Sequence, residues 1–294
     1  MSGTNFPFQF NVLRKKFFWT GYWLFTVLIA RAQMSGNPLA DYPGAGAFSI
    51  QHADIGSCTI NPASLAQLKQ TAIGLYAQRP FLLKEMNEYT AMTGIVTAPG
   101  NFAGSICYGG YAGYNETHVQ LAYGRKLGTR LDIGVQAGYH RFQISNGYGA
   151  ASTLTMKVGT VLHISDKLHT GFIVDNPLPN RFGQIKDEKI PTIILAGIGY
   201  EPSSKFLFSV KLQKEENHPV SINPVVQYNP VRRILIRFGI QPETNSSWLG
   251  AGFIFNQYRL DIAAGYHPQL GVTPGVMLII NFEPADDQTL LLTK

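Results

Sequence analysis

The sequence predicts an all-β fold, a transmembrane antiparallel β-barrel of about 14 strands, with a short plug or cap segment at its N-terminal end. Two patterns predict it: segments of about ten residues alternate apolar and polar side chains, and the connections between them alternate in length. Composition agrees, because 14% of residues are charged, against about 25% in an ordinary soluble domain.

The alternation with a period of two residues is the pattern of a strand with two different faces. Residues 131–140 place Leu131, Ile133 and Val135 on one face, with Asp132 and His140 on the other. We count fourteen such segments, at 70–79, 88–97, 102–111, 115–127, 130–144, 152–164, 167–176, 191–201, 205–214, 219–229, 232–241, 247–256, 258–267 and 275–282. Most are near ten residues long, which suits a tilted strand that crosses a bilayer.

The connections fall into two sets, as the periplasmic turns and external loops of an outer-membrane barrel do. Those at 98–101, 128–129 and 256–257 are short, whereas those at 80–87 and 177–190 are longer or rich in polar residues. An even number of strands places both ends of the barrel on the periplasmic side. The loop 177–190 is the longest, and it is interpreted either as a contact for a partner or as a simple lid.

A soluble β-sandwich or propeller is the alternative fold, but it would carry charge on its outward face. Here the apolar face is nearly free of charge over many strands, whereas the other face is polar, so a lipid-facing wall around a polar lumen is favoured. The residues expected to face the lumen are His118, Asp132, His140, Lys157, Arg233, Arg237, Arg259 and Asp261. Their bases either favour anions or pair with the acids in a balanced wall.

Residues 1–32 are typical of a signal peptide for export. A basic cluster, Arg14 to Lys16, precedes the apolar run 17–30, and Ala30-Arg31-Ala32 forms a cleavage motif. The apolar run is shorter than the ~20 residues that a membrane-spanning helix needs, although a retained anchor is the alternative. These residues hold four bases and no acid, so 20 bases face 18 acids in the rest. Such a balance predicts no nucleic-acid partner.

Residues 33–68 stand outside the strand series and are rich in small residues, so we expect them to plug or cap the lumen ahead of a barrel at 69–282. Asn61-Pro62 is a turn-forming pair, and Pro62 can begin a short helical turn through Leu68. The alternative is a leader that packs beneath the barrel. The last strand ends at Phe282, and residues 283–294 are expected to be a periplasmic tail.

The stretch GAGAFSIQHADIGSCTINPASLA (residues 44–66) resembles the N-terminal hallmark of the FadL-like outer-membrane barrels, including the PorV/PorQ group of Bacteroidetes. Gly44, Gly46, Ala47 and Phe48 match its glycine-rich start, Asp54 its second acid, and Asn61, Pro62 and Ala63 its corner. Ala53 and Ile55 depart from it. Segments 114–142, 190–215 and 265–282 are also similar to this group. The resemblance implies that Asp54 and the 61–63 corner form the plug hinge.

Motifs for chemistry are few. His118 and His140, and likewise His163 and His169, are expected to be cross-strand neighbours facing the lumen, but no third ligand accompanies either pair, so no metal site is predicted. No hydrolase, zinc-protease or phosphate-loop motif occurs, so we expect neither an enzyme nor a cofactor. Cys58 and Cys107 are either a disulfide or two free thiols.

Two functions remain open for a barrel surrounded by outer-membrane lipid in a Gram-negative bacterium. The resemblance to FadL-type proteins implies passive uptake of a small hydrophobic ligand, gated by the N-terminal segment, with a local pocket expected beside Phe253, Phe255 and Met277. The resemblance to the PorV/PorQ group implies instead a barrel that transports nothing and serves a type IX-like secretion system or another envelope protein as a partner.

Overall fold

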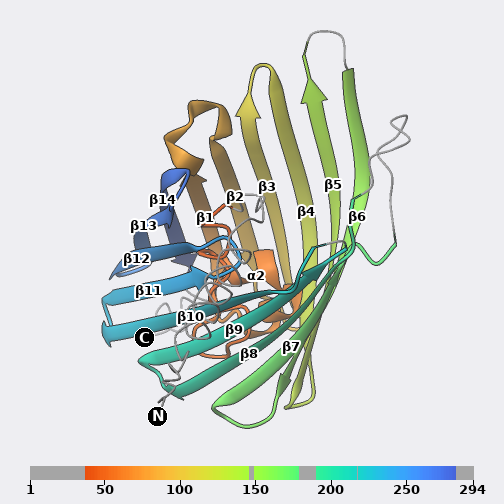
Figure 1. Cartoon of the computed structure of the whole chain (residues 1–294). Coiled ribbons are helices and arrows are strands. Elements are labelled where there is room, and N and C mark those ends of the chain that lie inside the picture. Colours follow the sequence, from red (N-terminus) through yellow and green to blue (C-terminus); the bar gives the residue numbers. More distant parts are fainter. Residues whose placement is uncertain (1–36, 146–148, 179–189, 217, 283–294) are drawn as a thin grey trace, which may run out of the picture. The chain divides into compact units, whose positions relative to one another are not determined.

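The computed structural model describes residues 37–145, 149–178, 190–216 and 218–282, all within one compact unit, Gly36–Lys294. In these residues, fourteen antiparallel strands form a closed barrel in which each strand pairs with its neighbours in sequence, and β1 pairs with β14 (Figure 1). The strands are β1 (Thr71–Gln78), β2 (Glu88–Ile95), β3 (Asn101–Tyr111), β4 (Tyr114–Leu127), β5 (Leu131–Ile144), β6 (Gly149–His163), β7 (Leu168–Asp175), β8 (Ile193–Ser203), β9 (Phe206–Glu215), β10 (Ser221–Val231), β11 (Ile234–Gln241), β12 (Ser246–Phe255), β13 (Tyr258–His267) and β14 (Gly271–Phe282).

The predicted fold and strand count are confirmed, and each predicted segment overlaps one observed strand. The largest change at a strand start is in β14, which begins at Gly271 rather than at residue 275. Closure leaves no strand edge without a partner, as a bilayer requires. Irregular pairing occurs where β8 meets β9, between Tyr200 and Ser203, and where β10 meets β11, between Tyr228 and Val231.

The outer face of the barrel is apolar along the middle of its strands. On β5, Val135 and Tyr139 are exposed, whereas Asp132 and Gln136, at the alternate positions, are buried inside. Aromatic side chains gather near strand ends: Phe206 stacks on Tyr228, with ring centroids 4.4 Å apart. A wall of this kind is stable against hydrocarbon, flanked by aromatic residues at the interfaces.

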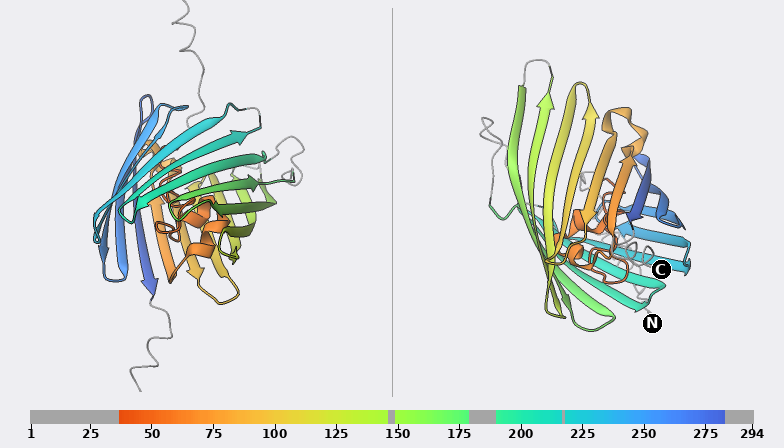
Figure 2. Two further views of the ribbon diagram at one scale, coloured as in Figure 1. Left: turned by 90° about the horizontal axis from the view of Figure 1, so that it is seen from below. Right: turned by 180° about the vertical axis from the view of Figure 1, so that it is seen from behind.

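Residues 37–70 lie within the ring of strands, and most of their side chains are buried (Figure 2). This N-terminal segment contains a short helix, α2 (Ser57–Ile60), and a 3-10 helix, η1 (Pro62–Gln67). Most of its apolar side chains, with Leu39, Ile55 and Leu65 among them, form one cluster with lumen-facing Met92 and Met277. A second cluster joins its Ala47 and Phe48 to Ile173 and Leu195 of the wall. The barrel therefore has a packed interior built from its own N-terminal segment.

The first long connection, between β1 and β2, carries two single-turn 3-10 helices, η2 (Pro80–Leu82) and η3 (Lys84–Met86). Phe81 and Leu82 have positive φ angles of 54° and 60° there. Phe81 packs edge-on to His267 of β13, with ring centroids 6.1 Å apart. The loop is thereby packed against the ends of β13 and β14, where the N–H of Phe81 donates to Oγ1 of Thr273 at 3.0 Å.

Several expectations lie outside the described residues. They are the signal peptide at 1–32, the tail at 283–294 and nearly all of the 177–190 loop. In the described part of the chain, no helix has the length and apolarity to cross a bilayer.

Candidate functional site

A shelf of glycines on three adjacent strands receives the Asn61-Pro62 corner. Gly124 pairs with Gly134 across β4 and β5, and Gly134 pairs with Gly159 across β5 and β6. A Cβ added at Gly134 would collide with the backbone of Pro62 and Ala63. The segment can therefore lie directly on the barrel wall only because these positions have no side chain.

Asn61 is the hydrogen-bonding centre of this corner, and it is fully buried. Its side-chain oxygen accepts a hydrogen bond from the backbone N–H of Ala63 at 3.0 Å and so caps η1. Its amide nitrogen donates to the carbonyls of Ala47 and Thr160, each at 3.3 Å. Pro62 then begins the 3-10 helix, where its missing N–H costs nothing. One side chain thus joins two parts of the segment to β6.

Asp54 joins the segment to two arginines of the opposite wall. Its Oδ2 accepts from Nη2 of Arg237 at 2.9 Å and from Nη1 of Arg259 at 2.8 Å. Arg259 also forms a bidentate pair with Asp261, with both bonds at 2.9 Å. Burial alone would raise the pKa of Asp54, but the two guanidinium groups outweigh it and hold that pKa well below its ordinary value.

An ion pair and a hydrogen bond to a carboxylate also hold the segment. Asp41 forms an ion pair with Lys211 of β9, and its other oxygen accepts from Asn223 Nδ2 at 2.9 Å. On β8, the buried Glu201 accepts from the backbone N–H of Ile50 at 2.8 Å. Since these partners come from strands far along the chain, sequence reasoning missed Asp41 and Glu201, and no local motif identifies either.

The second histidine pair forms with Asp132 a buried chain near the end of β6. His163 and His169 are cross-strand partners, as expected, and their Nδ1 atoms lie 3.1 Å apart. His163 Nε2 faces Asp132 Oδ2 at 2.9 Å, and Gln67 of the segment donates to the same oxygen at 2.5 Å. Asp132 therefore meets a histidine and the segment rather than a lysine or arginine.

Most of the predicted basic residues of the lumen pair with acids, which favours a balanced wall over an anion-selective surface. Besides the arginines at Asp54, Lys157 lies 3.0 Å from Asp175, and its Nζ donates to the carbonyl of Thr59 at 3.2 Å. The prediction that Arg233 faces the lumen is wrong, because this residue is exposed in the turn between β10 and β11. Arg233 would face the lumen if β11 extended to include it, but β11 begins one residue later, at Ile234.

A cavity of about 780 Å³ remains between the segment and the wall formed by β1 to β4. Its apolar lining includes Ile60, Met86 and Met92, and its polar lining includes Glu88 and Gln120. The prediction of a pocket beside Phe253, Phe255 and Met277 is wrong. Phe253 and Phe255 follow the outward parity of β12 and are 53% and 66% exposed, whereas Met277 is buried in the core around the segment.

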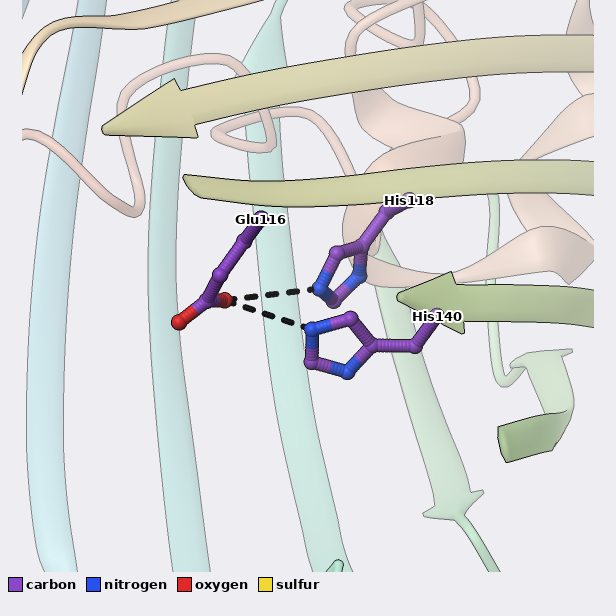
Figure 3. A group of neighbouring side chains, drawn as sticks. All are labelled: Glu116, His118 and His140. Carbon is purple, nitrogen blue, oxygen red and sulfur yellow. Dashed lines mark hydrogen bonds and ion pairs between the residues drawn. The ribbon is translucent and has the colours of Figure 1, made fainter. Parts of the chain in front are cut away.

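His118 and His140 are cross-strand partners, as expected, with ring centroids 3.5 Å apart. The expectation that no third ligand accompanies them is wrong, because Glu116 lies beside both (Figure 3). Glu116 precedes His118 by two residues on the same face of β4, so strand periodicity alone could have identified it.

Both cysteines are free: Cys58 is buried, and burial raises its pKa to about 12, whereas Cys107 is half-buried.

No family model and no curated protein matches the sequence. Among solved structures, the chain is similar to the toluene transporter TodX of Pseudomonas putida, with a TM-score of 0.61, 9% identity, and 84% of this chain and 97% of that chain covered. The toluene transporter TbuX of Ralstonia pickettii gives 0.60, 10%, 85% and 98%. A FadL homologue of Pseudomonas aeruginosa gives 0.59, 10%, 86% and 100%.

At such low identity these likenesses show the fold alone, a closed antiparallel barrel shared with the two toluene transporters and the FadL homologue. A closed 14-stranded barrel with an apolar exterior is a protein of the Gram-negative outer membrane, so the predicted location is confirmed. Membership of the PorV/PorQ group stays a prediction.

Proposed function

We propose that the chain is a passive channel for small hydrophobic molecules, in which residues 37–70 are the gate. The observation that carries this proposal is the cavity of about 780 Å³ beside the segment. Its volume lies within the range of ~300–1,000 Å³ that is usual for small-molecule sites. Ile60, Met86 and Met92 offer apolar contact in it. The solved toluene transporters of the same fold support this class of ligand.

The gate role rests on how the segment is held. Besides apolar packing against wall residues such as Met92 and Met277, the segment is attached by ion pairs and hydrogen bonds of Asp41, Asp54 and Asn61. These polar contacts are reversible, and water can replace each of them when the segment moves. The strands, in contrast, are joined by continuous ladders around a closed barrel. Movement of the segment therefore opens the lumen without breaking the wall.

The test is native mass spectrometry of the protein purified in mild detergent from its own membrane, followed by extraction and identification of any small molecule. Gly109→Trp places an indole in the cavity, whereas Gly104→Trp places one on the outer face of the same strand. We expect one apolar molecule per barrel in the wild type and in Gly104→Trp, and loss of it in Gly109→Trp. Equal ligand content in both variants would contradict the cavity assignment.

A second function, a non-transporting partner of a secretion or envelope assembly of PorV/PorQ type, is favoured by one observation. At Gly124 and Gly134 the segment touches the wall backbone to backbone, and at Gly159 the Asn61 side chain touches it, so that part of the lumen is filled. The same measurement separates the two candidates. A stoichiometric protein partner without any small molecule supports the assembly function, and a small apolar molecule without a protein supports the channel.

A further inference from the structure

Glu116, His118 and His140 direct their polar atoms toward one point at the end of the lumen near the turn between β3 and β4. Oε2 of Glu116 lies 3.8 Å from Nε2 of His118 and 3.3 Å from Nε2 of His140. One ligand atom from each side chain lies within 4.8 Å of the others (Figure 3). We propose that these three residues bind one divalent transition-metal ion, with Zn²⁺ as the expected metal.

The spacing fits a tetrahedral ion. Two ligand atoms bound at about 2.0–2.1 Å with a tetrahedral angle lie about 3.3 Å apart. The two carboxylate–imidazole separations are therefore already close to those of a loaded site. Even the widest separation needs to close by at most about 1.5 Å, which small side-chain rotations supply. Two imidazoles and one carboxylate are ligands that suit zinc, copper and nickel rather than calcium or magnesium.

Tyr114 orients the carboxylate. Its hydroxyl donates a hydrogen bond to Oε1 of Glu116, which leaves Oε2 directed at the two imidazoles. Partners of this kind fix the geometry of metal ligands and raise their affinity. Glu116 and His118 also line the lumen cavity, so a fourth position is open to water or to a ligand. Three protein ligands and one open position are the usual arrangement of a reactive zinc site.

The other histidine pair shows why this cluster is distinctive. His163 faces Asp132 through Nε2 and His169 through Nδ1, so its two partners lie on opposite sides of its ring. One ion cannot contact both partners and His163 at once. At His118 and His140, in contrast, both rings present Nε2 to the same carboxylate oxygen. The polar atoms of Glu116, His118 and His140 therefore converge on one point, whereas those around His163 lie in a row.

The experiment measures zinc binding by isothermal titration calorimetry to the full chain in detergent, purified with a tag that contains no histidine. We expect one Zn²⁺ per chain in the wild type, and a visible absorption band of tetrahedral Co²⁺ when cobalt replaces zinc. His140→Ala and Glu116→Gln should weaken zinc binding at least ~100-fold, and Tyr114→Phe ~10-fold, because it changes only the orienting contact.

His218→Ala is the matched control, because His218 lies 3.7 Å from Glu215 in a partly exposed pair outside the proposed site. It should leave zinc affinity unchanged, and the heat-modified mobility of the barrel on a gel verifies that each variant is folded. The proposal is overturned if the wild type binds no zinc, or if folded His140→Ala and Glu116→Gln bind it as tightly as the wild type. The proposal does not depend on transport, so either result leaves the proposed channel untouched.

Discussion

Replacing Asp54 with alanine tests whether the buried ionic contacts hold the N-terminal segment in the lumen. Asp54 shares one oxygen with Arg237 and Arg259, and these side chains are 14%, 1% and 11% exposed. Without it, Arg259 keeps its bidentate pair with Asp261, but Arg237 retains its hydrogen bonds to Gln227 and the carbonyl of Tyr42 and its contact with the Tyr42 ring, none of which carries a negative charge. Its buried charge is then unpaired while the segment stays in place.

Breaking a buried pair by removing one partner costs ~3–5 kcal/mol. Release of the segment lets water reach Arg237, so the cost falls on the docked state and shifts the equilibrium toward release. At 1.36 kcal/mol per tenfold change, the released fraction should rise about 10²- to 10⁴-fold. The barrel itself should stay closed, because Asp54 belongs to no strand.

Cys58 measures the release directly. Its side chain is buried, and its Sγ donates to the carbonyl of Ile55 within the segment. With Cys107 replaced by serine, a maleimide should label Cys58 at a rate proportional to the released fraction, so Asp54→Ala should label ~100-fold faster or more. Asp166→Ala, in an exposed turn, is the control. A labelling rate within about twofold of the wild type would refute the reasoning, because such a shift is below 0.5 kcal/mol.

Two further predictions concern the same equilibrium. Gly134→Val should force the 61–63 corner off the wall and weaken docking of the segment by ~1–3 kcal/mol, which is measured as faster labelling of Cys58. Gly109→Val is the control: its added Cβ meets its nearest neighbour at 3.6 Å, so it should leave the labelling rate unchanged. Burial lowers the pKa of His52, against an opposing effect of Glu201. Because the released histidine binds the proton more readily, docking should weaken as pH falls below about 6.5, by up to 1.36 kcal/mol per unit. The urea midpoint followed by Trp248 fluorescence, with the two tryptophans before residue 33 replaced, should fall in the wild type and less in His52→Gln.

The fold could be predicted from sequence because a bilayer restricts the wall so strongly. Lipid outside and polar groups inside enforce a two-residue period, so Val135 and Asp132 reveal their faces without any knowledge of their neighbours. Arg233 shows the limit of that reasoning: parity gives the face, but the strand's end decides whether the residue reaches the lumen. The contacts of Asp54 could not be predicted, because Arg237 and Arg259 meet it only after the barrel closes around the segment.

Different interactions stabilise the barrel wall and the N-terminal segment, and this difference bears on function. The wall depends on hydrogen-bond ladders that close on themselves, whereas the segment is held by buried charges, Asn61, a shelf of glycines and apolar packing against residues such as Met92 and Met277. At the glycine shelf the contact involves no interlocking side chains, so the segment can leave β4 to β6 without repacking of those strands, whereas its departure from the apolar cluster exposes Met92 and Met277. Buried charges add strong dependence on geometry, since a small displacement loses the bonds of both arginines to Asp54 at once. Such a segment is expected to release in one step, as a gate does, while the barrel around it stays intact.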